Sequence, residues 1–162
     1  MTLSNRRNFM VGVATVALIG SVKAQGATTH DVKMLNAHPD DPRKRMVFYP
    51  RVLQIKPGDS VRFIPTDPAH NSQTTKGMVP EGAEGWKSGF NKEVTITLNQ
   101  AGVYGYNCQP HQAAGMVGLV IVEGENKLAN LEAAKGVRQI GLAKKVWEEI
   151  WAEAEDKGYL SA

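Results

Sequence analysis

The sequence is poor in cysteine: its 162 residues contain one, Cys108. A single cysteine excludes an internal disulfide, so the fold must be held together by packing and by any metal that it binds. Internal repeats and low-complexity linkers are absent as well. Residues 25–162, which remain once the N-terminal segment described next is set aside, have a suitable length for a single domain with a real core.

A hydrophobic run long enough to cross a membrane is also missing. The apolar stretch 11–22 has about a dozen residues, whereas a spanning helix needs about 20. It follows Arg6 and Arg7 and ends at Val22-Lys23-Ala24, which resembles a small-residue cleavage site. We therefore interpret residues 1–24 as an export signal of the twin-arginine type that is cleaved from the mature protein. The mature form is then not inserted in a membrane.

The net positive charge of the sequence comes from residues 1–24. The whole sequence has 19 Lys and Arg against 16 Asp and Glu. Three of the bases, Arg6, Arg7 and Lys23, lie within residues 1–24, which contain no acid, so the remainder is formally neutral. The basic isoelectric point therefore reflects targeting, and no nucleic-acid partner is indicated.

What the sequence does contain is a set of metal-ligating side chains. Cys108, His111 and Met116 form the pattern C-x2-H-x4-M, and His70 lies upstream. A thiolate, two imidazoles and a thioether are the ligands of a blue-copper electron-transfer site, and they suit both Cu(I) and Cu(II). Pro110 restricts the loop that holds three of them, and Gly115 permits an unusual turn before the methionine.

Each of these residues also has an ordinary structural interpretation, as a core cysteine, a gap-filling methionine or a solvated histidine. The coincidence of all four favours copper. Zinc is a weaker interpretation because methionine is not among its usual ligands. A cysteine nucleophile paired with His111 is weaker still, because no orienting acid or oxyanion loop accompanies it. The other histidines, His30 and His38, are expected to be solvated.

Short segments rich in β-branched and aromatic residues predict a mainly β fold. Turn formers such as Pro57-Gly58-Asp59 separate them, and apolar residues alternate most clearly at 61–63 and 94–98. This pattern indicates a Greek-key antiparallel β-sandwich, with the metal at one end where loops meet. The predicted strands are 32–35, 46–49, 52–55, 60–64, 94–98, 103–107 and 117–122.

The C-terminal part, residues 125–162, is predicted to be a helical extension packed on the sandwich. Apolar residues recur at helical spacing from Ala143 to Ala154, and Gly158 can end the helix. A shorter helix over 131–135, capped by Asn130, precedes it. A partner-binding role for the apolar face is a weaker interpretation, because such a stripe usually faces a core.

Several segments accompany the ligand pattern, among them Val79-Pro80-Glu81-Gly82-Ala83-Glu84, His70-Asn71, Cys108-Gln109-Pro110-His111 and Gly115-Met116. With them the chain resembles the pseudoazurins, small cupredoxins with a type 1 blue copper centre. The resemblance covers residues 28–162, and the run 80–84 followed by Trp86-Lys87-Ser88 separates it from plastocyanin-like relatives. It departs from the common pattern at Gln109, where threonine is usual, and at Pro68 and Asn107, where lysine is usual.

By this resemblance, His70, Cys108, His111 and Met116 ligate one copper ion, and Asn71 holds the two ligand loops together. The implied function is that of a monomeric one-electron carrier of the periplasm, not an enzyme, with a copper nitrite reductase and a c-type cytochrome as partners in denitrification. A copper storage or delivery protein is the alternative. A copper enzyme is disfavoured, because it would need a second metal site and a longer chain.

Overall fold

The computed structural model describes residues 26–161 of the chain. The export signal predicted for residues 1–24 lies outside this range. Within it, neither of the two α-helices combines the length and the apolarity that crossing a bilayer requires.

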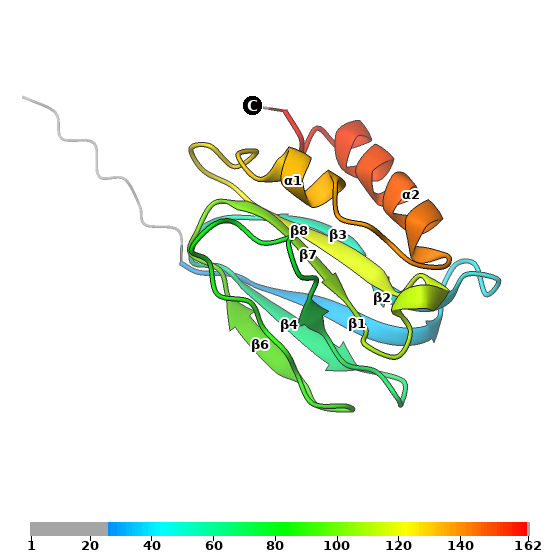
Figure 1. Ribbon diagram of the computed structural model, residues 1–162. Coiled ribbons are helices and arrows are strands. Elements are labelled where there is room, and N and C mark those ends of the chain that lie inside the picture. The colour runs from blue at the N-terminus through cyan, green and yellow to red at the C-terminus, as the bar shows by residue number, and fades with distance from the viewer. Residues whose placement is uncertain (1–25, 162) are drawn as a thin grey trace, which may run out of the picture.

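Two four-stranded sheets and a layer of helices make up the fold (Figure 1). The first sheet has the order β2-β1-β4-β6 and the second the order β3-β8-β7-β5. The strands of the first sheet are β1 (Thr29–Ala37), β2 (Arg45–Tyr49), β4 (Ser60–Pro65) and β6 (Val94–Thr97). Those of the second are β3 (Val52–Ile55), β5 (Gln73–Thr74), β7 (Gly102–Asn107) and β8 (Val117–Val122).

The β-sandwich prediction is confirmed, but the sheets are not purely antiparallel. Strand β1 runs parallel to β4, and β3 runs parallel to β8. The chain leaves the first sheet after β2 and returns to it at β4, so β3 does not pair with β2 or with β4, its neighbours in sequence. Alternation of apolar residues shows which face of a strand is buried but not the direction of its neighbour. Strand β5, two residues long, has no periodicity to detect and was not predicted.

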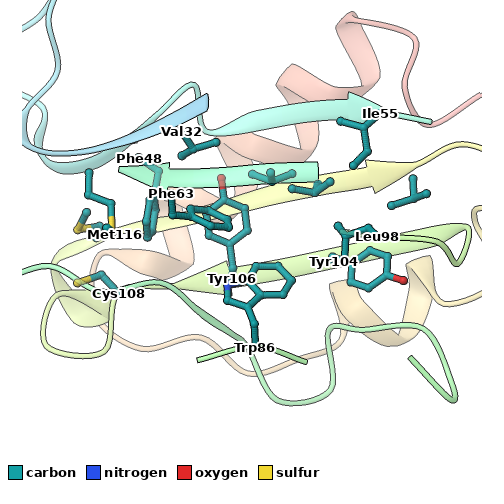
Figure 2. Packing of buried hydrophobic residues seen from close by; sticks show 14 residues of the cluster. Val32, Phe48, Ile55, Phe63, Trp86, Leu98, Tyr104, Tyr106, Cys108 and Met116 are labelled. Carbon is teal, nitrogen blue, oxygen red and sulfur yellow. The ribbon is translucent and has the colours of Figure 1, made fainter. Parts of the chain in front are cut away.

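Aromatic rings fill the space between the sheets (Figure 2). Phe63 is fully buried, with its ring centroid 5.0 Å from that of Tyr106 and 5.6 Å from that of Trp86. Cys108 and Met116 lie at one end of this cluster, and Ile55 lies at the other (Figure 2). The core therefore extends directly to the end of the sandwich that carries the predicted ligands.

The predicted helices are present and pack on the second sheet. Helix α1 (Leu131–Lys135) contacts β7, and α2 (Ala143–Asp156) contacts β3 and β8 (Figure 1). The buried face of α2 consists of Ala143, Trp147, Ile150 and Ala154, as the spacing predicts. Beside this face, Arg51 forms ion pairs with Glu149 (3.1 Å) and Glu153 (2.9 Å), which join the helix to the residue before β3.

Asn130 precedes α1 as predicted, but its side chain does not cap the helix. Its Oδ1 accepts a hydrogen bond from the Val103 backbone N–H (3.0 Å), and its Nδ2 donates to the Val103 carbonyl (2.8 Å). The amide thus pairs with β7 as a neighbouring strand would. An asparagine carries both a donor and an acceptor, so it can satisfy a strand residue as well as a helix end.

At the end of the sandwich far from Cys108, Asp59 joins several segments. Its carboxylate accepts hydrogen bonds from the backbone N–H groups of Thr28 (2.8 Å) and Lys56 (3.1 Å) and lies 3.1 Å from His30 Nε2. His30, which was expected to be solvated, is thus partly buried and held by this carboxylate, with 27% of its side chain exposed. His38 is also engaged, because its Nδ1 accepts the N–H of Asp40. The bonds to Asp59, foremost that from Thr28, lower the pKa of its carboxyl to about 2.

Asp59→Asn should change how stability depends on pH. Because the pKa of Asp59 is lower in the folded protein than in the unfolded chain, the carboxylate stabilises the fold above about pH 4, and this contribution is lost as pH falls towards 2. At pH 7 we expect the variant to be less stable by about 1 kcal/mol, the part of the shift that survives solvent screening. Denaturant unfolding of both copper-loaded proteins between pH 7 and 2.5 tests this. A stability difference that stays constant over that range would contradict it.

Candidate metal centre

Two loops at one end of the sandwich carry the predicted ligands. His70 lies between β4 and β5, and Cys108 directly follows β7. His111 precedes a short 3-10 helix, η1 (Gln112–Ala114), and Met116 immediately precedes β8. Ligands that are far apart in the sequence therefore meet because β4, β7 and β8 place their connections at the same end (Figure 1).

The structure brings two imidazoles and the thiol together. The Nδ1 atoms of His70 and His111 are 3.2 Å apart. The Cys108 Sγ lies 3.9 Å from the first and 3.5 Å from the second. Within residues 26–161 this is the one group of three or more His, Cys, Asp or Glu side chains with ligand atoms close enough for a single ion.

These separations fit one transition-metal ion. With metal-to-nitrogen bonds of about 2.0 Å and metal-to-sulfur bonds of about 2.3 Å, the lengths known for zinc, two donors on one ion lie at most about 4 Å apart. All three separations satisfy this limit. Soft thiolate and thioether sulfur beside imidazole favours copper over the harder metals.

Met116 belongs to the same loop as Cys108 and His111. Its backbone carbonyl accepts the N–H of Cys108 (3.0 Å), and its own N–H donates to the His111 carbonyl (3.0 Å). Gly115 precedes it with φ of 94°, in the left-handed region that favours glycine. The turn predicted at Gly115 is thus confirmed, and these two bonds fold the loop back on itself. Figure 2 places Met116 at the same end of the core as Cys108.

A partner that the sequence did not reveal orients the His70 ring. The Oδ1 of Asn36, near the end of β1, lies 3.0 Å from His70 Nε2. An amide oxygen only accepts, so Nε2 carries the proton and Nδ1, which faces Cys108, is left with its lone pair. Asn36 is 34 positions from His70, and no local motif marks it. A polar residue inside a strand that is otherwise apolar at this end was the one available clue.

Asn71 connects the two ligand-bearing segments, as predicted. Its Oδ1 accepts the backbone N–H of Gln109 (2.7 Å), and its Nδ2 donates to the Ser88 carbonyl (3.4 Å). Asn71 is buried, so these bonds are shielded from water. The position of the residue after His70 is thereby tied to that of the residue after Cys108.

A third asparagine fixes the chain before His70. Ala69 has φ of 70°, which is unfavourable for a residue with a Cβ. The Oδ1 of Asn91 accepts the N–H of Ala69 (2.6 Å), while the Asn91 N–H donates to the His70 carbonyl (2.8 Å). The loop 88–91 therefore stabilises an otherwise costly backbone conformation beside His70.

Burial shapes the protonation of the donors. It raises the pKa of the Cys108 thiol, although the backbone N–H groups of Asn71 and His111 oppose this by stabilising the thiolate. Burial, and next the nearby charge of His111, lowers the pKa of His70. Without metal the pocket thus favours a neutral thiol and a neutral imidazole. Metal binding must release the thiol proton, whereas His70 is already in its ligand form.

Access to solvent is unequal among the four residues. His70, Cys108 and Met116 are each 0% exposed, whereas His111 is half-buried. Its neighbours Pro110, Ala113 and Ala114 are exposed. One imidazole edge thus connects the buried donors to the protein surface.

Comparison with known proteins agrees with this donor set. The chain matches the copper binding proteins of the plastocyanin/azurin family over residues 36–123. It is 40% identical to a pseudoazurin of Methylorubrum extorquens over 90% of this chain and 96% of the relative. It is 39% identical to a pseudoazurin of Paracoccus pantotrophus over 88% and 93%, respectively. The crystal structure of pseudoazurin from Methylobacterium extorquens AM1 superposes with a TM-score of 0.71 at 42% identity, covering 77% of this chain and 98% of that one.

The family match and the fold lead to the same assignment. The sandwich with its C-terminal helices is cupredoxin-like, as in the pseudoazurin structure. The thiol and imidazoles that it gathers are the donors of a blue copper site. The chain therefore belongs to the pseudoazurins, which are copper-containing electron carriers of the plastocyanin/azurin family.

Proposed function

We propose that His70, Cys108, His111 and Met116 hold one copper ion and that the protein shuttles single electrons between redox proteins of the periplasm. The observation that carries this proposal is the convergence of the three donor atoms within 3.9 Å of one another in a site of which one imidazole reaches the surface. Bound copper supplies the Cu(I)/Cu(II) couple. A site of this kind transfers electrons without transforming a substrate.

The protein's own contribution is to keep the donors in place. Asn36 orients the His70 ring, Asn71 ties the two ligand loops together, and the backbone bonds of Met116 close the loop 108–116. Donors that are held by the fold, rather than by the metal alone, move little when the charge of the ion changes. Small movement lowers the barrier to electron transfer, so this rigidity suits a carrier.

The exposed edge of His111 is the proposed exit for the electron. Small apolar side chains around it suit brief docking, and exposed bases can orient an acidic partner before contact. Lys76 and Lys87 are exposed, and neither forms an ion pair within the described residues. From the family resemblance we propose a copper nitrite reductase as acceptor and a c-type cytochrome as a further partner.

A copper storage or delivery role needs a site that releases its metal readily. Full burial of three of the four proposed ligands supports the carrier instead. The periplasmic location rests on the export signal proposed for residues 1–24. The neutral balance of the remaining chain is compatible with free diffusion there.

Cys108→Ala should abolish the blue copper spectrum. Because the intense visible band arises from thiolate-to-copper charge transfer, removal of the only thiol removes the band even where copper still binds the imidazoles. His38→Ala is the matched control, since His38 lies outside the cluster, and it should retain the band. Visible spectra of the copper-loaded proteins test this. Copper loss to a chelator during repeated reduction and oxidation of the parent would favour the delivery alternative.

Asn71→Ala should weaken both the fold and the site. The substitution removes the acceptor of the Gln109 N–H, and loss of such a hydrogen bond costs about 1 kcal/mol. It also frees the two ligand loops to move relative to each other, so we expect the reduction potential to change as well. Denaturant unfolding and redox titration of the copper-loaded protein measure the two effects, with the exposed Asn99→Ala as control. An unaltered potential at reduced stability would restrict Asn71 to a structural role.

Lys76→Glu combined with Lys87→Glu should slow electron transfer to an acidic partner. The effect should be larger at low than at high ionic strength, because salt screens charges that are separated before contact. Stopped-flow measurement of the second-order rate constant with a copper nitrite reductase tests this. Lys33→Glu, an exposed base on β1, is the control. Equal rates for the double variant and the parent at low salt would refute this docking site.

A further inference from the structure

The helical extension touches the loop that carries His111. Just before α2, the backbone N–H of Leu142 donates a hydrogen bond of 2.8 Å to the Ala113 carbonyl in η1. Ala113 lies two residues after His111 and three before Met116. The start of α2 is thereby bonded directly to the short segment that joins two of the proposed ligands (Figure 1).

Two glycines allow this approach. Gly141 has φ of 56°, and a Cβ placed on it would lie 2.3 Å from the Ala113 carbonyl oxygen, which is a backbone atom. Gly115 has φ of 94°, and a Cβ there would lie 2.8 Å from Cγ2 of Val146 on α2. The helix and the ligand loop are therefore packed without room for a further methyl group on either side.

The helix is itself fixed to the sandwich. Its side chains Trp147, Ile150 and Ala154 are buried against the second sheet, and Arg51 holds two of its acids. The loop 111–116 thus lies between strands on one side and an anchored helix on the other. Because α2 is held in place, it restricts the movement of the loop that it contacts.

We propose that the start of α2, residues 141–146, is a positioning element that sets the reduction potential of the copper site through the ligand loop. This inference rests on the ligand assignment proposed above. The region of the chain that matches the plastocyanin/azurin family ends at residue 123, so this contact is an addition outside the shared sandwich. The potential of such a site depends on its axial ligand and on the surroundings of the cysteine sulfur. Val146 packs on Gly115, which directly precedes the proposed thioether ligand Met116.

Two pairs of variants separate this role from general stability. Gly141→Ala places a methyl group against Ala113, whereas Gly158→Ala introduces the same residue at a positive φ of 71° where nothing lies within 4 Å. Val146→Ala removes the contact with Gly115. Its control, Ile150→Val, reduces the buried face of the same helix one turn further along.

The measurements are the reduction potential and the charge-transfer spectrum of each copper-loaded protein, together with its unfolding midpoint. We expect the potential and the band to shift in Gly141→Ala and Val146→Ala and to stay at parental values in the two controls, even where the controls lose stability. Parental potentials in Val146→Ala and in a folded Gly141→Ala would overturn the proposal, as would equal shifts in all four. If Gly141→Ala does not fold, the comparison of Val146→Ala with Ile150→Val decides.

The same experiment keeps the two proposals apart. A reversible one-electron couple and a blue spectrum in the parent concern the proposed function alone. The differences between variants concern the role of α2 alone. A parent without the blue spectrum would overturn the ligand assignment, whereas a normal parent with insensitive variants would overturn the positioning role only.

Discussion

The rest of the molecule depends on one constraint: three electron-pair donors from two separate loops must be held within 4 Å of one another. Two imidazole nitrogens and a thiol sulfur meet this condition at the end of the sandwich, where water cannot reach most of them. Backbone and amide hydrogen bonds maintain the cluster from outside. The free-energy cost of bringing the donor atoms together is thus met during folding, and the metal binds to a site that is already arranged.

Three asparagine side chains provide hydrogen bonds around the cluster. Each of Asn36, Asn71 and Asn91 joins segments that are distant in sequence, and each does so next to His70 or Cys108. An amide can accept and donate without carrying charge, so it strengthens the site without adding an electric field that would favour one oxidation state strongly. Rigidity and electrostatic neutrality are therefore obtained from the same residue type.

Features that depend on residues close in sequence could be predicted, whereas those that depend on distant residues could not. The motif at 108–116 and the helical spacing of α2 are local patterns, so the ligand loop and the buried face of the helix were predictable. Asn36 and the parallel pairing of β1 with β4 depend on residues more than 30 positions apart, and no pattern within a segment encodes them. Asn130 was misinterpreted for a related reason: its position predicted a cap, whereas its actual partner is a strand reached only after folding.

The pairing of Asn130 with Val103 has a wider consequence. Strand β5 covers β7 only at Tyr106 and Asn107, so the rest of that border would otherwise present unsatisfied peptide groups. The carbonyl of Gly105 accepts from Thr75, its N–H donates to Met78, and the amide of Asn130 covers Val103. Along this border, β7 therefore does not offer a row of unpaired peptide groups to which a strand of a second molecule could bond. Protection against such self-association is valuable to a protein that must meet other molecules briefly and separate again.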